Sequence, residues 1–425
     1  MHDAVVIGAG HNGLVAANVL ADAGWSVLVV EAEEEAGGAV RSGELIEPGF
    51  LHDRFSAFYP LGAASPVFRT LGLEIPFRHG PLVLAHPDED GSCAVLSRDV
   101  AESVQTMGEE WPELIEVWKR IEPAVLRGMT TPFPQVRSAL QLALEPSAVR
   151  LMRPFGSELA RRLLNGNTLH TDIPPASLLG RGFGLILTAF AQRYGYPCVE
   201  RGAGVLTQAL VARARERNVE LRLGERVTTM PRARHAVLAA VDVWELARLA
   251  GGAQHIPPDP ATVKVDWTLD GPVPWTAEAP RRSPVVHVGE EHSFVLFGQY
   301  SMADPSRAPA GKETAWAYTH DLRNADAVEE RIERLAPGFR ALIRGRHVQH
   351  LPPGRVNGGT ARRQLVFRPR FGRPRISDGV YLASMSAHPG GGVHGSPGWI
   401  AAQAALRSAS RRRARGFASF TISRT

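Results

Sequence analysis

The sequence predicts an α/β fold in which a parallel-sheet domain is discontinuous along the chain and an α+β domain is inserted into it. Three observations predict this arrangement. The chain opens on a strand, turn, helix and strand in immediate succession, a second helix-and-strand block follows near residues 202–240, and a strand with a glycine-rich turn returns after residue 379. A length of 425 residues and a hydrophobic content of 44 % suffice for two such globular domains.

The elements of the first 31 residues can be assigned residue by residue. Ala4–Ile7 is a short apolar run typical of a buried strand, and residues 8–13 form a glycine-rich turn. Residues 14–23 then continue with apolar side chains at helical spacing, and Val27–Val30 forms a second apolar strand that ends at Glu31. This order is the start of a βαβ unit.

The turn matches the G-x-G-x-x-G pattern of Rossmann-type dinucleotide sites. Gly8 permits the tight turn, Gly10 lets the backbone approach a pyrophosphate, and Gly13 allows the helix to pack closely on the strand. Glu31, 18 positions beyond Gly13, is placed to accept a hydrogen bond from a ribose hydroxyl. The alternative is an ordinary βαβ turn without a ligand. The expected contacts are Gly8, Ala9, Gly10, His11, Asn12, Gly13, Glu31 and Ala32.

The segment after Glu31 distinguishes between dinucleotides. Residues 37–42, Gly-Gly-Ala-Val-Arg-Ser, resemble the extended signature of the FAD-dependent amine oxidase and phytoene desaturase superfamily. The resemblance implies that FAD is the cofactor and that Gly38, Ala39 and Arg41 lie beside its pyrophosphate. A solvated surface arginine is the alternative role for Arg41.

Two later blocks also resemble this superfamily. Residues 202–227 are similar to its helix and strand that return to the FAD domain, which implies that Val227 meets the adenine through its backbone. Residues 379–395 carry the sequence His-Pro-Gly-Gly-Gly-Val, which is similar to the segment that packs on the FAD pyrophosphate and ring in phytoene desaturase-like enzymes. This implies contacts from Ser384, Gly391, Gly392 and Val393. Many members have glycine where this chain has Ser384, so a narrower approach to the cofactor is expected.

Further similarity to phytoene dehydrogenase-related proteins covers residues 49–66, 167–197, 267–275 and 304–312. It implies a Rossmann-type FAD-binding domain assembled from residues 1–80, 195–255 and 355–410, a substrate domain from residues 81–194 and 256–354, and a basic tail over 411–425. The chain is shorter than the family pattern after Val227, where only eight residues precede the next strand, and again around residues 351–357. Residues 178–190 are apolar and either line a substrate cavity or form a buried helix.

Composition narrows the classes of function and partner. The net charge of +5 comes without a basic stripe interleaved with aromatics, so we expect no nucleic-acid partner. The two cysteines form no C-x-x-C pair, and no metal-ligand cluster is evident. The first strand begins so near Met1 that we expect no signal peptide, and no stretch is apolar enough to span a bilayer, so a cytoplasmic protein is predicted. The arginine-rich tail is expected to be an irregular end, with peripheral contact to an anionic membrane as the alternative.

The predicted activity is that of an FAD-dependent oxidoreductase that dehydrogenates or desaturates an apolar small molecule. No second G-x-G-x-x-G follows a strand, so electrons are expected to come from the substrate and to pass to oxygen, a quinone or another carrier. The alternatives are a flavin amine oxidase and an FAD-binding protein with little turnover. His388 and His394 flank the last glycine turn and are candidate catalytic bases, or else they hold that turn by hydrogen bonds. Asp53, beside His52, is either near the flavin or a turn residue. The sequence does not indicate an oligomeric state.

Overall fold

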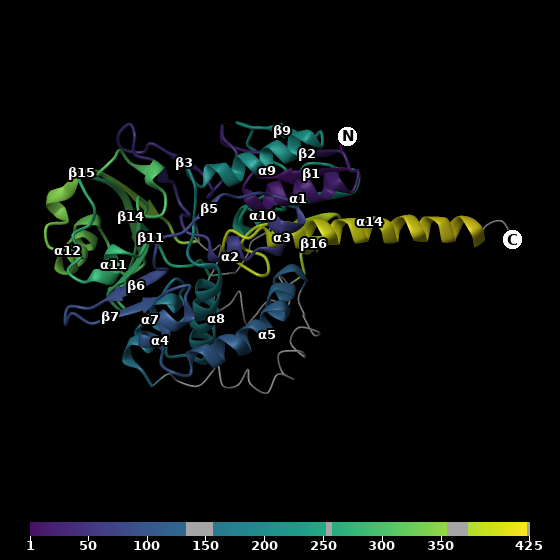
Figure 1. Cartoon of the computed structure of the whole chain (residues 1–425). Helices are drawn as coiled ribbons and strands as arrows, with labels where there is room; N and C mark the ends of the chain where they lie inside the picture. Colours follow the sequence, from purple (N-terminus) through teal and green to yellow (C-terminus); the bar gives the residue numbers. More distant parts are fainter. Residues whose placement is uncertain (133–155, 252–256, 355–372, 423–425) are drawn as a thin grey trace.

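The computed structural model describes residues 1–132, 156–251, 257–354 and 373–422 and contains two main sheets (Figure 1). The first sheet has six strands in the order β16-β17-β10-β1-β2-β9. All neighbours are parallel except β16 and β17. The strands are β1 (Ala4–Ile7), β2 (Val27–Val30), β9 (Glu220–Arg222), β10 (Ala236–Ala239), β16 (Arg375–Ser377) and β17 (Val380–Leu382).

Segments far apart in sequence therefore build this sheet, as predicted. β1 and β2 are buried at every position, as is typical of parallel strands that are covered on both faces. Helix α1 (His11–Asp22) packs against α9 (Gly204–Glu216) and α14 (Ser396–Ile422), and these helices bury a core together with the central strands. Helix α10 (Val243–Leu249) follows β10. Residues 223–235, all of which the structure describes, contain no additional strand between β9 and β10, in agreement with the short spacing in the sequence.

The second sheet has seven strands in the order β15-β11-β14-β13-β12-β6-β7, and its only parallel pair among the strands described is β12 with β6. The strands are β6 (Leu84–Pro87), β7 (Cys93–Leu96), β11 (Thr262–Leu269), β12 (Val285–Val288), β13 (Val295–Gln299), β14 (Glu313–Thr319) and β15 (Ile343–Leu351).

Alternate residues of these strands face two different layers, as the pleat requires. Trp267 of β11 and Phe297 of β13 pack on α12 (Ala325–Leu335). Trp316 of β14 and Leu296 of β13 face the opposite side and share a core with a group of helices. Those helices are α4 (Val100–Met107), α5 (Trp111–Thr130), α7 (Glu158–Thr168) and α8 (Leu178–Tyr194).

Short elements connect the two parts. The connecting segments contain β3 (Ser42–Gly43), β4 (His52–Asp53), α2 (Pro60–Ala63), α3 (Pro66–Thr70), β5 (Phe77–Arg78) and β8 (Cys198–Val199). The remaining short elements, α11 (Glu278–Arg281) and the 3₁₀ turns η2 (Pro305–Arg307) and η3 (Arg340–Leu342), belong to the second part. The predicted α/β class with an inserted α+β part is confirmed. The exact domain boundaries stay a prediction, and some of them fall on residues outside those described.

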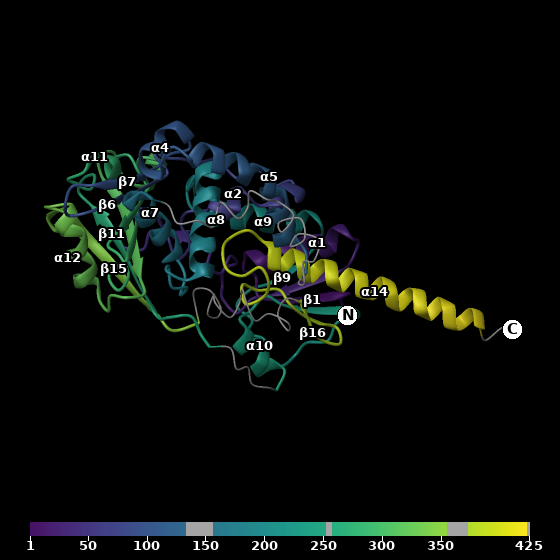
Figure 2. The same ribbon diagram turned by 90° about the horizontal axis from the view of Figure 1, so that it is seen from below.

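The structure bears on two regional expectations. The apolar passage at residues 178–190 is part of α8, whose buried residues pack in the second domain while Leu178 and Ile186 are exposed. The passage therefore forms a helix, and its role in lining a cavity stays a prediction. The irregular tail expected from residue 411 is wrong up to residue 422, because α14 continues through it and projects from the body of the protein (Figure 2). Alanine and arginine are strong helix formers, and no glycine or proline interrupts residues 399–415. Within the parts of the chain described, no helix has the length and apolarity to cross a membrane.

Candidate functional site

The glycine turn between β1 and α1 has the steric properties that its motif predicts. Gly8 has a φ of +97°, and a Cβ there would come within 3.0 Å of the Ala240 carbonyl oxygen. A Cβ on Gly13 would lie 2.0 Å from the Gly8 carbonyl oxygen. At Gly10, by contrast, a Cβ would meet nothing within 4 Å. Gly8 and Gly13 are thus required by the protein's own packing, whereas Gly10 borders open space.

Gly10 is also the N-cap of α1, and no described side chain caps this helix end. The first N–H groups of an α-helix have no partner within the helix, and the helix dipole places partial positive charge there. In the same turn, His11 Nε2 and Asn12 Oδ1 are buried without a hydrogen-bond partner among the described residues. This combination of space, free donors and positive potential suits a bound pyrophosphate.

Glu31 lies at the end of β2 beside this turn. Its Oε2 accepts a hydrogen bond from the Ala9 amide at 2.7 Å, and its Oε1 accepts one from the Glu33 amide at 3.0 Å. A carboxylate oxygen has two lone pairs, so each oxygen can accept a further donor. The two amides hold the Glu31 carboxylate in a position where ribose hydroxyls could donate to it. Ala32 lies between Glu31 and Glu33 in the sequence.

The second glycine pair lies against the first turn. The Gly37 amide donates to the Ala9 carbonyl oxygen at 2.9 Å, and a Cβ on Gly38 would lie 3.2 Å from the Gly10 Cα. Arg41 is half-buried, and its Nε donates to the Gly38 carbonyl oxygen at 3.0 Å. Gly38, Ala39 and Arg41 are therefore adjacent to the α1 N-terminus. This geometry argues against the alternative that Arg41 is a freely solvated surface residue.

The predicted adenine-side residue, Val227, lies in the loop after β9. It is partly buried and packs against Val5 of β1 and against Leu28 and Val30 of β2. Its backbone carbonyl oxygen accepts a long hydrogen bond of 3.4 Å from Arg248. Val227 is thus close to the strands that lead into the glycine turn and into Glu31.

The last glycine turn, residues 390–392, also meets the α1 N-terminus. The His11 ring hydrogen-bonds the backbone of Gly392, and burial lowers the pKa of His11 to about 4. Val393 is buried in the core of the first domain. Ser384 is buried, and its hydroxyl accepts from the Ser386 amide at 3.3 Å, so this serine side chain is turned to its own loop.

The two histidine candidates have partners that fit a role in holding this turn. His394 Nδ1 accepts from the Ser396 amide at 3.1 Å, and its Nε2 lies 3.2 Å from the Gly391 carbonyl oxygen. Burial, with a smaller effect of His11, lowers the pKa of His394 to about 3. His388 Nε2 lies 3.0 Å from the carbonyl oxygen of Gly128 in α5. Their geometry favours the alternative role, in which hydrogen bonds hold the segment in place.

Asp53 is the centre of a buried polar cluster where the two parts of the chain meet. Its Oδ1 accepts from the Ser42 hydroxyl at 2.6 Å and from the Ala203 amide at 2.7 Å. Its Oδ2 accepts from Tyr300 Oη at 3.1 Å and from Arg307 Nη2 at 3.2 Å. Asp53 and Arg307 are both fully buried. Asp53 is therefore more than a turn residue, since it joins the segments that contain Ser42, Ala203 and residues 300–307.

Lys264 is a functional candidate that our sequence reasoning missed. This lysine of β11 is 2 % exposed and forms a buried ion pair with Asp266. Its Nζ also donates to the Asp53 carbonyl oxygen at 3.2 Å and lies 6.0 Å from the centre of the Trp316 ring. Buried lysines are rare, but nothing in the sequence around Lys264 indicates its burial, so no sequence signal could have identified it.

Aromatic rings continue from this point along the helix-facing side of the second sheet. Phe58 stacks on Tyr300 with 5.4 Å between ring centres and lies 6.1 Å from the Trp316 ring. Trp316 in turn stacks on Tyr318 at 6.0 Å with an interplanar angle of 12°. We call Phe58, Tyr300, Trp316 and Tyr318 the aromatic row. It lies next to the buried lysine and the Asp53 cluster, within the hydrophobic core that the second sheet shares with its helices.

Two buried histidines, His86 and His287, and the half-buried His170 lie on the same side of the sheet. His170 Nε2 and His287 Nε2 are 2.9 Å apart, and the rings of His86 and His287 have centres 5.4 Å apart. Burial lowers the pKa of His170 to about 3 and that of His86 to about 4. These neutral rings come from three distant segments, so no sequence pattern predicted their meeting.

Comparisons with known proteins agree with this geometry. Residues 3–148 match the family model described as FAD dependent oxidoreductase. FAD is the cofactor. The chain is also similar to a limonene dehydrogenase subunit of Castellaniella defragrans, with 35 % identity over 126 residues that span 28 % of this chain and 22 % of that protein. It is 24 % identical to pyridine nucleotide-disulfide oxidoreductase domain-containing protein 2 of Rattus norvegicus, over 96 % of this chain and 93 % of that one.

Solved structures show the same fold. An oxidoreductase from Methanosarcina mazei aligns with a TM-score of 0.59 at 14 % identity, covering 95 % of this chain and 99 % of the other. Cyclohexylamine oxidase from Brevibacterium oxydans aligns with a TM-score of 0.58 at 16 % identity, covering 97 % and 99 %. The predicted fold class and cofactor are confirmed, and the chain shares the fold of these solved structures.

Proposed function

We propose that this chain dehydrogenates or desaturates an apolar small molecule, such as a carotenoid, another polyene or a natural-product intermediate. Oxygen, a quinone or another carrier would accept the electrons. The aromatic row carries this proposal, because four adjoining rings next to a buried lysine make this part of the second domain suited to contact with a planar or hydrocarbon substrate. The partial match to a protein named as part of a limonene dehydrogenase supports the same class of substrate.

In this proposal the residues of the α1 N-terminus hold the cofactor. Amides of the Gly10 turn would bind the pyrophosphate, Glu31 would accept from the ribose, and Arg41 would offset phosphate charge. Gly38, Gly391, Gly392 and Val393 would line the remaining approach. FAD, when bound, supplies a hydride acceptor. The protein's own contribution is then to orient the substrate and to exclude water, and both roles fit the apolar aromatic row.

The proposal is tested by anaerobic addition of substrates to the FAD-loaded protein while the absorbance of oxidised flavin is followed. We expect a terpene or carotenoid to bleach the flavin and a primary amine of similar size to leave it oxidised. Bleaching by amines alone would support the amine oxidase alternative. If a chemical reductant bleaches the flavin but no candidate of either class does, the alternative of a flavoprotein with little turnover gains support. Peripheral membrane contact stays a prediction.

A further inference from the structure

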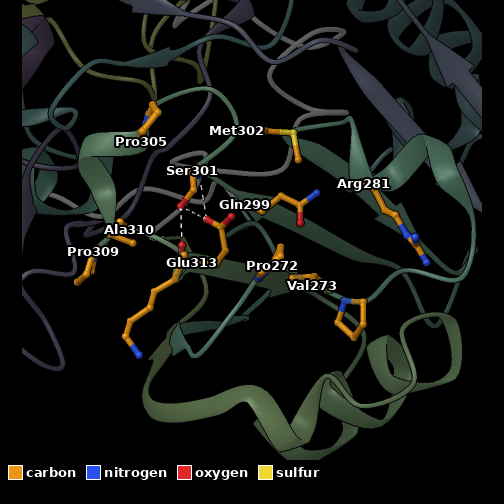
Figure 3. Close-up of a pocket in the computed structure, with 14 residues that line it drawn as sticks. Pro272, Val273, Arg281, Gln299, Ser301, Met302, Pro305, Pro309, Ala310 and Glu313 are labelled. Atoms are coloured by element: carbon orange, nitrogen blue, oxygen red, sulfur yellow. Dashed lines mark hydrogen bonds between the residues drawn. The ribbon is translucent and has the colours of Figure 1, made fainter.

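A pocket of about 760 Å³ opens in the second domain, away from the FAD-binding turns (Figure 3). Its wall comes from the loop after β11, from α11, from the end of β13 and from the loop that leads into β14. Most of the lining is apolar and includes Pro272, Val273, Met302, Pro305, Pro309 and Ala310. None of the predicted FAD contacts lines it.

One buried carboxyl group lines this otherwise apolar pocket. Glu313, the first residue of β14, is only 3 % exposed. Its Oε1 accepts three hydrogen bonds of 2.9 Å, from the Tyr300 amide, the Ser301 amide and the Ser301 hydroxyl. The Thr314 amide also hydrogen-bonds the carboxyl group, and no side chain among the described residues donates to its Oε2. Figure 3 shows the carboxyl group of Glu313 beside Ser301 among the pocket side chains.

The charges around the pocket do not neutralise Glu313. Lys312 Nζ donates to Asp270 at 2.5 Å, and Arg281 Nε donates to the Trp275 carbonyl oxygen at 2.6 Å. No ion pair joins Glu313 to any of the residues that the structure describes. Burial opposes the carboxylate form, whereas the hydrogen-bond donors of Tyr300, Ser301 and Thr314 favour it, and a buried carboxylate without a counter-ion is energetically costly. A cation at Oε2 would remove that cost.

We propose that this pocket binds a small molecule with an apolar body and one ammonium group, the ammonium donating to Oε2 of Glu313. The prolines and Met302 would cover the apolar body. An anionic ligand fits less well, because Lys312 is already paired and Arg281 is exposed to solvent, where its attraction is screened. This binding site is separate from the proposed dehydrogenation at the FAD.

The pocket is connected to the Asp53 cluster through one residue. The Tyr300 amide donates to Glu313, and the Tyr300 hydroxyl donates to Asp53 at 3.1 Å. The loop that follows Tyr300 also supplies Asp304 and Arg307, whose ion pair completes the cluster. A ligand that changes the charge balance at Glu313 therefore acts on the loop that holds Asp53.

The test uses the FAD-loaded, oxidised protein and calorimetric titration with phenethylamine and with 2-phenylethanol, which lacks the ammonium group. Glu313→Gln keeps an oxygen that can accept the three hydrogen bonds but removes the charge. Glu278→Gln, an exposed residue of α11 outside the pocket lining, is the matched control. Ala310→Trp keeps the carboxyl group and fills the pocket from an exposed position.

We expect phenethylamine to bind the wild type and the Glu278→Gln control equally, and to bind Glu313→Gln at least about tenfold more weakly, since a charge-assisted hydrogen bond is lost. Ala310→Trp should also lose binding, and 2-phenylethanol should bind the wild type as weakly as phenethylamine binds Glu313→Gln. Equal affinity in Glu313→Gln and wild type, or no binding to wild type at millimolar concentration, would overturn the proposal. Flavin bleaching, recorded in parallel, reports on the proposed catalytic function alone.

Discussion

Gly10 and Gly13 belong to the same turn, yet the structure predicts opposite consequences for their replacement by alanine. Gly10 has φ and ψ of −65° and 166°, which any residue adopts, and a Cβ there meets nothing within 4 Å. Gly10→Ala should therefore leave the stability of the apoprotein within about 1 kcal/mol of wild type. A Cβ on Gly13 would lie 2.0 Å from the Gly8 carbonyl oxygen. Gly13→Ala should therefore destabilise the apoprotein by about 1–3 kcal/mol.

For Gly10 we expect FAD binding, and not the stability of the apoprotein, to be affected by replacement with alanine. The open space beside Gly10 is where the pyrophosphate would approach the backbone, so an added methyl group displaces the phosphates from the α1 amides. The loss of one charge-assisted hydrogen bond, about 1.5–3 kcal/mol, weakens affinity about ten- to a hundredfold. Chemical unfolding of the apoproteins and titration of FAD by quenching of its fluorescence measure the two effects. Wild-type FAD affinity in Gly10→Ala would refute this reasoning.

Three further predictions follow from other contacts. Glu31→Arg should weaken FAD retention, because it removes the expected ribose acceptor and places a cation beside the adenosine; unchanged flavin content after purification would contradict that role. Asp53→Asn should lower the free energy of unfolding by about 1–3 kcal/mol, because it removes the charge of one of the two carboxylates that pair with the buried Arg307, the other being Asp304, whereas Asp378→Asn, at an 83 % exposed side chain, should change it little. Burial raises the pKa of Glu313 from 4.5 to about 7, so the folded state holds a proton that the unfolded state has lost in this pH range. The free energy of unfolding of the wild type therefore falls as pH rises from 4.5 to about 7, by up to about 3 kcal/mol. Glu313→Gln should melt at a higher temperature than wild type at pH 8 but not at pH 4, and equal melting temperatures at pH 8 would count against the shift.

Features that depend on neighbours in the sequence were predictable. The turn at Gly8, Gly10 and Gly13 and the acid at Glu31 lie within one βαβ unit, so their spacing fixes their geometry before the rest of the chain folds. The prediction of an irregular tail from residue 411 is wrong because a run of arginines does not by itself prevent a helix. Arginine and alanine both favour the helical structure that α14 continues.

Features that depend on tertiary assembly were not predictable. Lys264 and Arg307 approach Asp53 only because β11 and the loop before β14 pack against the segment around β4. His170, in the turn after α7, and His287 of β12 meet although they are more than a hundred residues apart in the sequence. In both cases the residues are too far apart in the sequence to form a recognisable motif. The unusual burial of a lysine is visible only after the sheet has formed.

The visible absorption spectrum of the purified protein, followed by identification of the cofactor released on denaturation, tests the central claim most directly. The convergence of the Gly10 turn, Glu31 and the Gly391–Gly392 turn on one helix N-terminus predicts the bands of oxidised flavin and the release of FAD. A colourless protein that cannot be reconstituted with FAD would contradict it.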